Sequence, residues 1–216
     1  MRILIFIMRI LIFGDSITYG VWDEQGGWTQ RFRKLLDQQN LADLSKELKL
    51  VYNLGITKDT SEDIRSRFES ETNSRKREGE RLLTIIAVGT NDSAYSNEMK
   101  TTRVPAGRFK SNLEWLIKKS RDLKATPVLV GLIGVDESKT KPLYWNYNLS
   151  YRDNLISEYN LIILEVADSE KVPFVDFFTN LKDRKDLLYD GLHPNAEGHK
   201  IISESIFEYL KDEEII

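Results

Sequence analysis

Short apolar runs alternate along this chain with longer stretches in which apolar residues return at helical spacing. Each run is mainly apolar rather than alternating between apolar and polar residues, and four of the five are followed directly by a glycine. Continuous apolar runs of this kind are typical of parallel strands that are covered on both faces. The pattern predicts buried strands at residues 9–13, 50–54, 82–88, 127–133 and 172–176.

The stretches between the runs predict helices. Thr60 and Asp63 resemble a capping box at the start of one stretch, and Pro105 suits the first turn of another. The last stretch has an apolar stripe at residues 202, 206, 209 and 210. Strands that alternate with helices predict an α/β fold with a five-stranded parallel sheet. We expect a single domain over residues 8–216, because no interior linker or low-complexity segment divides the chain.

Composition narrows the chemistry. The 216 residues include 31 basic and 34 acidic side chains, so the net charge is −3, which argues against a nucleic-acid partner bound mainly through phosphates. Cysteine is absent, which excludes disulfides, thiolate metal sites and a cysteine nucleophile. With only His193 and His199 available as imidazole ligands, we expect no metal site.

The N-terminus contains a repeat, because residues 1–6 have the same sequence as residues 8–13. Arg9 interrupts the apolar run, and no small-residue cleavage site follows, so the segment does not have the form of a signal peptide. It is also too short to span a membrane. We interpret residues 1–7 as a duplicated extension without a function, with an ordered functional extension as the alternative. We expect a cytoplasmic protein without a membrane span.

Polar motifs follow the predicted strands. Ser16 lies in Gly-Asp-Ser-Ile after the first strand, Gly55 ends the second, and Asn91 lies in Gly-Thr-Asn-Asp after the third. Asp190 and His193 belong to Asp-Gly-Leu-His-Pro-Asn, just before the last helix. In a parallel α/β sheet, ligands bind at the carboxyl ends of the strands. These motifs therefore place a serine, an asparagine, a histidine and an aspartate at one edge.

This set of residues suits acyl transfer by a serine nucleophile. Ser16 needs a base to take its proton, His193 is a candidate base, and Asp190 is placed to orient the imidazole. The backbone N–H groups of Ser16 and Gly55 and the side-chain amide of Asn91 are candidate oxyanion donors. Each residue also has an ordinary structural role open to it: a helix cap for Ser16, a turn for Gly55 and an Asx turn for Asn91.

The four motifs together resemble the GDSL/SGNH hydrolase family, with the variant spelling Gly-Asp-Ser-Ile. The four residues that define the family correspond to Ser16, Gly55, Asn91 and His193, and its Asp-x-x-His pair corresponds to Asp190 and His193. The resemblance implies a flavodoxin-like three-layer α/β/α sandwich, ester or thioester hydrolysis, and no metal or organic cofactor. The nucleophile elbow of α/β-hydrolases is absent, because Thr18 stands where its second glycine would be.

Neighbouring residues receive supporting roles. We expect Asp15 to order its loop as a hydrogen-bond acceptor, Asp92 to brace its own loop, and His199 to face solvent on the last helix. The aromatic cluster at residues 143–147 either packs on the core or walls the acyl pocket, and the same two readings apply to Trp22 and Trp28. The long loop at 93–104 is expected to shape the pocket.

The sequence therefore predicts a serine esterase that acts on small-molecule esters with short to medium acyl groups. A carbohydrate O-acetylesterase and a lysophospholipase or thioesterase are alternatives within the same chemistry. A flavodoxin-like phosphate- or nucleotide-binding module is the alternative from another class, although the loop around Ser16 lacks the glycine spacing of a phosphate cradle. The oligomeric state is not predicted.

Overall fold

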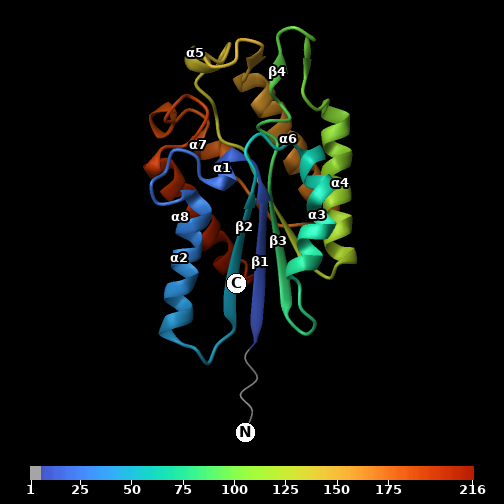
Figure 1. Ribbon diagram of the computed structural model, residues 1–216, viewed down its shortest axis with the longest axis vertical. Helices are drawn as coiled ribbons and strands as arrows, with labels where there is room; N and C mark the ends of the chain where they lie inside the picture. The colour runs from blue at the N-terminus through green and yellow to red at the C-terminus, as the bar shows by residue number, and fades with distance from the viewer. Residues whose placement is uncertain (1–5) are drawn as a thin grey trace.

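A computed structural model describes residues 6–216 and places a five-stranded parallel sheet at the centre of the molecule (Figure 1). The strands are β1 (Ile7–Gly14), β2 (Leu48–Gly55), β3 (Arg81–Ala87), β6 (Thr126–Val130) and β8 (Phe174–Val175). Their order across the sheet is β2-β1-β3-β6-β8, which is the flavodoxin-like order. The five predicted strands and the three-layer α/β/α fold are thus confirmed.

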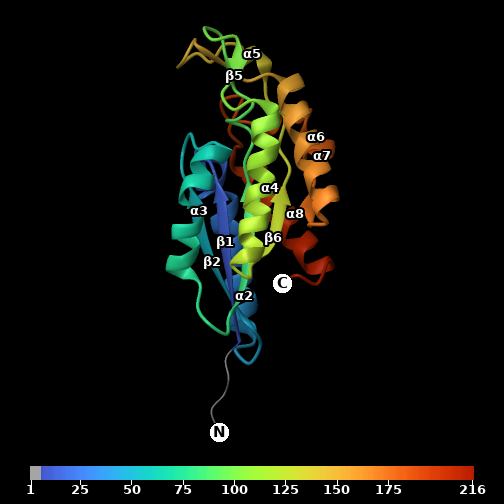
Figure 2. The same ribbon diagram turned by 90° about the vertical axis from the view of Figure 1, so that its right-hand side faces the viewer.

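Helices cover both faces of the sheet. On one face lie α3 (Ser61–Arg75), α4 (Ala106–Asp122) and α6 (Asp153–Glu170), and on the other lie α2 (Gly27–Ala42) and α8 (Ala196–Asp212) (Figures 1 and 2). Each face has its own apolar core, because alternate β1 side chains point to opposite sides. Leu11 and Phe13 join the core of the first face, whereas Ile10 and Ile12 join that of the second.

The sheet register aligns the ends of neighbouring strands. Gly14, the last residue of β1, pairs with Gly55 of β2 and with Ala87 of β3. Loops that leave these three strands therefore start at the same level, at the upper edge in Figure 1. The short helix α1 (Ser16–Tyr19) follows β1 directly at this edge.

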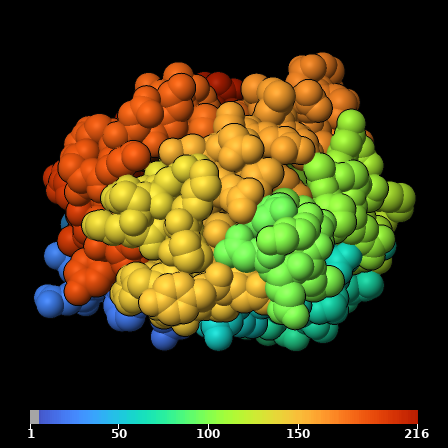
Figure 3. All heavy atoms as spheres, turned by 90° about the horizontal axis from the view of Figure 1, so that it is seen from above, coloured from blue at the N-terminus to red at the C-terminus, as the bar shows by residue number. Residues whose placement is uncertain are grey.

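A second, smaller sheet lies above the carboxyl edge. It joins β4 (Tyr95–Ser96), β5 (Thr101–Thr102) and β7 (Leu149–Ser150) in antiparallel pairs. The segment predicted as a long loop at 93–104 thus contains two of its strands. In the view from above, this green segment and the yellow-to-orange segment around α5 (Glu137–Thr140) cover much of the surface (Figure 3).

Local sequence explains the ends of the helices. Thr60 and Asp63 form the predicted capping box of α3, with the Thr60 N–H donating to the Asp63 carboxylate at 2.8 Å. Asn195 caps α8 by accepting a hydrogen bond from the Gly198 N–H. The remaining short helices, α7 (Phe178–Leu181) and the 3₁₀ helix η1 (Lys185–Leu187), lead into the loop that contains Asp190 and His193.

The N-terminal repeat is only partly within the described residues. Residues 1–5 lie outside them, so the predicted lack of function for residues 1–7 stays a prediction. Ile7 is the first residue of β1 and pairs with Leu48, and the Phe6 carbonyl accepts a hydrogen bond from the Leu48 N–H. Between residues 6 and 216, no helix has the length and apolar character that a membrane crossing requires.

Candidate active site

The turn after β1 places Ser16 at the carboxyl edge of the sheet. Asp15 caps α1 by accepting a hydrogen bond from the Ile17 N–H at 2.9 Å. Gly14 allows the tight turn, because a Cβ at this position would lie 2.0 Å from Thr18 Oγ1. Ser16 is the first residue of α1 and its hydroxyl lines a cavity at this edge.

Ser16, His193 and Asp190 form a continuous hydrogen-bonded chain. Ser16 Oγ lies 3.0 Å from His193 Nε2, and His193 Nδ1 lies 2.8 Å from Asp190 Oδ2. Because a carboxylate only accepts, Nδ1 bears the proton and Nε2 is left to accept from the serine hydroxyl. The geometry therefore pairs a serine hydroxyl with a neutral imidazole nitrogen that can take its proton.

The loop that contains Asp190 also fixes the carboxylate. Asp190 Oδ1 accepts hydrogen bonds from the backbone N–H groups of Leu192 at 3.0 Å and His193 at 2.8 Å. Burial acts to raise the pKa of Asp190, but the hydrogen bonds from the His193 side chain and backbone outweigh it and lower the pKa to about 2. Asp190 is therefore ionised over the whole range in which a histidine base works.

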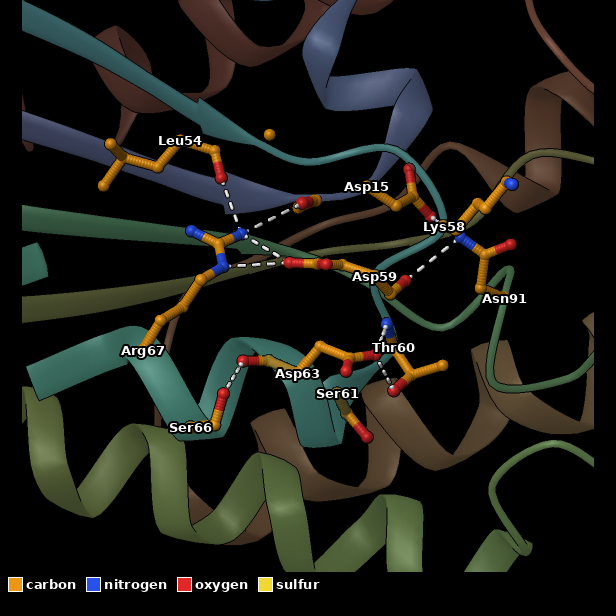
Figure 4. Close-up of polar contacts among 12 residues, drawn as sticks. Asp15, Leu54, Lys58, Asp59, Thr60, Ser61, Asp63, Ser66, Arg67 and Asn91 are labelled. Atoms are coloured by element: carbon orange, nitrogen blue, oxygen red, sulfur yellow. Dashed lines mark hydrogen bonds and ion pairs between the residues drawn. The ribbon is translucent and has the colours of Figure 1, made fainter.

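Asn91 follows β3 and is held in a fixed orientation. Its Oδ1 accepts a hydrogen bond from the buried Tyr151 hydroxyl at 2.7 Å, which directs Nδ2 away from Tyr151. Nδ2 donates to the Asp59 carbonyl at 3.0 Å and lies 3.4 Å from Asp15 Oδ2 (Figure 4). Asn91 lines the same cavity as Ser16 and His193.

Gly55 has surroundings that differ from those of its predicted role. Its N–H donates to Asn53 Oδ1 at 2.9 Å, and the residue is not among those that line the cavity. A Cβ at this position would lie 2.3 Å from the Tyr19 nitrogen and 2.8 Å from the Thr18 carbonyl carbon. The absence of a side chain at Gly55 therefore allows α1 to pack against the end of β2.

Lys58, three residues farther along the same loop, lines the cavity together with Ser16. It has a φ of +73°, a value usually adopted by glycine, in a turn closed by the Asp59 N–H and the Ile56 carbonyl. Lys58 lines the cavity, and its backbone N–H has no hydrogen-bond partner within residues 6–216. Its carbonyl accepts two hydrogen bonds of 3.2 Å from the Arg103 guanidinium.

The loop after Lys58 is tied to the sheet from below. Arg67 pairs with the Asp59 carboxylate at 2.8 Å and donates to the Leu54 carbonyl at 2.7 Å (Figure 4). The Asp59 carbonyl in turn receives the amide of Asn91. These contacts fix the positions of Lys58 and Asn91 relative to each other at the cavity.

Two buried carboxyl groups support these loops. Asp92 accepts hydrogen bonds from the Ser61 N–H and hydroxyl, and Asp15 accepts from Ile17 and Asn91. Burial raises the pKa of Asp92 to about 7 and that of Asp15 to about 6, against the smaller lowering effect of their hydrogen bonds. Asp15 thus contacts its own loop through Ile17 and the loop of Asn91, whereas the Asp92 side chain contacts the start of α3 at Ser61 rather than its own loop.

His199 does not face solvent, so the prediction for it was wrong. Its exposed fraction is 0%, its Nδ1 accepts from the Trp28 N–H, and its Nε2 lies 3.2 Å from the Val21 carbonyl. His199 belongs to the buried face of α8, where it holds the loop between α1 and α2. It does not reach the cavity.

The cavity beside the triad has a volume of about 600 Å³. Its lining is partly apolar and aromatic, with Trp22, Trp145, Leu143, Leu149 and Leu192, and partly polar, with Thr57, Lys58, Asn91 and Arg103. The predicted aromatic segment is divided, since Leu143 is buried, Trp145 lines the cavity, and Tyr144 and Tyr147 are exposed. Trp28 is a core residue. No three histidine, aspartate or glutamate side chains of residues 6–216 form a metal-binding group.

Comparison with known proteins identifies the family. Residues 12–201 match the GDSL-like Lipase/Acylhydrolase family. The chain belongs to this family. It is therefore an ester hydrolase whose substrates are small-molecule esters.

Several relatives of this acylhydrolase match more than nine-tenths of its length. The Bacillus subtilis protein named uncharacterized lipoprotein YqeF is 28% identical over 222 residues, covering 91% of this chain and 87% of that protein. A lipase/acylhydrolase from Enterococcus faecalis superposes with a TM-score of 0.73 at 23% identity, over 95% of this chain and 96% of that one. The acetylxylan esterase Axe2 from Geobacillus stearothermophilus gives 0.70 at 19% identity, over 94% and 93%. The two structures share the fold.

Sequence reasoning did not place Lys58 or Tyr151 at the acylhydrolase cavity, which both residues line. Lys58 follows a strand at the carboxyl edge, so its position was available as a signal, but its lysine side chain gives no indication of a positive φ. Tyr151 follows β7 of the small upper sheet, and nothing in its local sequence points to the cavity. Arg103 also lines the cavity and belongs to the 93–104 segment, which was expected to shape the pocket.

Proposed function

We propose that this chain hydrolyses carboxylic esters with Ser16 as nucleophile, His193 as base and Asp190 as the group that orients His193. The observation that supports this most directly is the unbroken chain from Ser16 Oγ through the imidazole to the Asp190 carboxylate, with distances of 3.0 and 2.8 Å. Both distances are within the range expected for a nucleophile–base–orienter arrangement.

The reaction proceeds in two stages. His193 Nε2 takes the Ser16 proton as Oγ attacks the acyl carbon, and the resulting imidazolium then gives that proton to the leaving alkoxide. A water molecule, activated by the same nitrogen, attacks the acyl-serine and releases the acid. Throughout, the proton on Nδ1 remains between His193 and Asp190, and the negative carboxylate stabilises the imidazolium.

We assign the oxyanion donors to the Ser16 N–H, the Asn91 amide and the Lys58 N–H. Lys58 replaces Gly55 in this assignment, because the Gly55 N–H is engaged by Asn53 and the Lys58 N–H is without a partner in the described part of the chain. Asn91 lines the cavity and Tyr151 fixes its amide orientation, and Nδ2 exchanges one of its contacts, with the Asp59 carbonyl or with Asp15 Oδ2, for the oxyanion. Donors held in fixed positions stabilise the negative charge that develops on the oxyanion.

The cavity supports short to medium acyl esters as substrates. The cavity volume of about 600 Å³ is within the range for small-molecule sites, and part of the cavity lining is apolar. Sugar acetates are a second candidate, because Trp22 and Trp145 are 58% and 46% exposed at the cavity and offer aromatic faces beside the polar Thr57 and Asn146. A structural neighbour, Axe2, is an acetylxylan esterase.

Hydrolysis of p-nitrophenyl esters from acetyl to palmitoyl tests the proposal, with acetylated xylose as a parallel substrate. We expect Ser16→Ala to lose almost all turnover, and Ser66→Ala, which changes an exposed serine on α3, to match the wild type. Asn91→Ala should lower kcat by about 10²–10³-fold. For Lys58, the Gly variant retains the N–H and tolerates the positive φ, so it should retain kcat.

The outcomes separate the assignments. Wild-type rates in Ser16→Ala would overturn the nucleophile, and a two- to threefold effect of Asn91→Ala would overturn its oxyanion role. Maximal activity on acetyl and butyryl esters would support the short-acyl reading, whereas activity on acetylated xylose alone would favour the carbohydrate esterase. The cytoplasmic location stays a prediction. Because the relative YqeF is named a lipoprotein, a membrane location is the alternative, and cell fractionation tests between the two.

A further inference from the structure

Trp22 makes a direct contact with the triad from outside the triad loops. Its indole N–H donates to Asp190 Oδ2 at 2.7 Å. Its ring meets the His193 imidazole edge-on, with centroids 6.4 Å apart and an interplanar angle of 88°, and lies 5.8 Å from the Tyr189 ring. Trp22 is 58% exposed, so this polar contact is made by a side chain that is otherwise largely open to solvent.

The backbone of Trp22 is in an unfavourable conformation. Its φ is +67°, a region that costs a bulky L-residue free energy and in which glycine is the usual occupant. Such strain persists only where the surroundings impose it, and it is enriched at functional sites. The strained residue is therefore the one whose only side-chain donor, the indole N–H, points at Asp190.

Contacts on both sides hold Trp22 in this conformation. On one side, the Val21 carbonyl faces Nε2 of the buried His199 at 3.2 Å. On the other, the Asp23 carboxylate pairs with Arg31 at 2.7 Å and accepts the Gly27 N–H at 3.1 Å. The loop is therefore anchored to α2 and α8, and Trp22 is positioned by rigid elements rather than by its own exposure.

The hydrogen bond from Trp22 completes the shell around Asp190. Oδ1 accepts two backbone N–H groups, and Oδ2 accepts His193 Nδ1 and Trp22 Nε1. Of these four donors, only Trp22 comes from outside the 190–193 loop. Without it, Oδ2 has a free lone pair for water, and the carboxylate can rotate away from the imidazole.

We propose that Trp22 is a positioning residue that acts on catalysis through Asp190, by locking the Oδ2 oxygen against the His193 ring. This proposal rests on the proposed function, in which Asp190 orients the base. Trp22 also lines the cavity, so a role as a simple wall for the substrate is the competing explanation. The two roles differ in which kinetic constant changes and in whether Asp190 must be present.

Trp22→Phe is the informative substitution, because it keeps an aromatic wall and removes the N–H donor. We expect kcat to fall about 10-fold while KM changes less than twofold, since a hydrogen bond to a charged group is lost and little contact surface is. Trp115→Phe is the matched control, because Trp115 lies on α4, packs against Phe68 and does not line the cavity. It should leave both kcat and KM unchanged.

A double-mutant cycle with Asp190→Ala decides between the two roles. If Trp22 acts through Asp190, Trp22→Phe should cause no further loss of kcat in the Asp190→Ala background. An equal 10-fold loss in both backgrounds, or a change confined to KM, would overturn the proposal. Ser16→Ala, assayed alongside, separates this result from a failure of the proposed function, and melting curves verify that each variant is folded.

Discussion

The two histidines of this acylhydrolase lie six residues apart and occupy opposite environments. His193 lies at the cavity, with Ser16 Oγ at one ring nitrogen and Asp190 Oδ2 at the other. His199 is fully buried on α8, with the Trp28 N–H at Nδ1 and the Val21 carbonyl at Nε2. Each ring makes one bond as an acceptor and one as a donor, so the number of contacts does not distinguish them.

The chemistry of the hydrogen-bond partners distinguishes the two histidine rings. A serine hydroxyl can give up its proton and a carboxylate can stabilise a positive ring, so His193 can change its charge during a reaction. An amide N–H cannot move away from Nδ1, so a proton on His199 would face another donor. Burial, the largest effect, correspondingly lowers the pKa of His199. The same side chain is thus a proton carrier at one position and a neutral connector at the other.

The largest expected effect comes from removing the proton carrier. His193→Ala should lower kcat by at least about 10³-fold, because Ser16 then has no base within reach. The free energy of unfolding should fall by about 1–3 kcal/mol, because His193 is buried and Asp190 loses a hydrogen-bond partner. Turnover of p-nitrophenyl acetate with urea unfolding of the same samples measures both. Activity within 10-fold of the wild type would contradict the assignment of His193 as base.

Much of this contrast could be predicted from the sequence, but not all of it. Continuous apolar runs gave the five strands, and the motifs at their ends gave Ser16, Asn91, Asp190 and His193 as neighbours at one edge. These residues come together because parallel strands end at one level, which depends only on the order of elements along the chain. Backbone hydrogen bonds of the sheet then hold the strand ends at that level.

His199 was predicted on the wrong side of α8, although its position was readable. It precedes Ile202 by three residues and Ile206 by seven, so it lies on the same face as the apolar stripe. A histidine whose two ring nitrogens both have backbone partners can be buried at little cost. The periodicity of α8 therefore predicts the position of His199 better than the polarity of its side chain does.

The sequence did not indicate which backbone N–H would be the oxyanion donor after β2. Gly55 was selected for its residue type, yet the N–H without a partner in the described chain belongs to Lys58, whose positive φ is imposed by a turn and by Arg103. Trp22 is similar, because its contact with Asp190 spans 168 positions in the sequence. Contacts of this range follow from the packed structure and leave no local pattern.

A smaller effect on activity and a larger one on stability are expected at the second histidine. His199→Leu fills the site but leaves the Trp28 N–H and the Val21 carbonyl buried without partners, which should cost about 2–4 kcal/mol of unfolding free energy. Activity at 20 °C should fall only modestly, through the loosened Trp22 loop. His199→Gln, which retains a donor and an acceptor, is the matched control and should lose less stability. A His199→Leu variant as stable as the wild type would show that these two hydrogen bonds contribute nothing.

The smallest effect is a pH dependence that belongs to His199 alone. Its lowered pKa means that, below about pH 6.5, the unfolded chain binds a proton at this position that the folded chain does not bind. The stabilising contribution of His199 is therefore complete above pH 6.5 and declines as the pH falls towards the folded-state pKa. His199→Gln has no such titration, so the stability difference between wild type and His199→Gln should shrink from pH 7.5 to pH 5, and comparing the two cancels the titration of Asp15 and Asp92. The total decrease should be about 1.4 kcal/mol for each pKa unit of lowering, measured by urea unfolding at several pH values. A difference that stays constant with pH, or grows on acidification, would mean that the folded chain binds a proton at His199 at least as readily as the unfolded chain does, and His199 would not be a neutral connector.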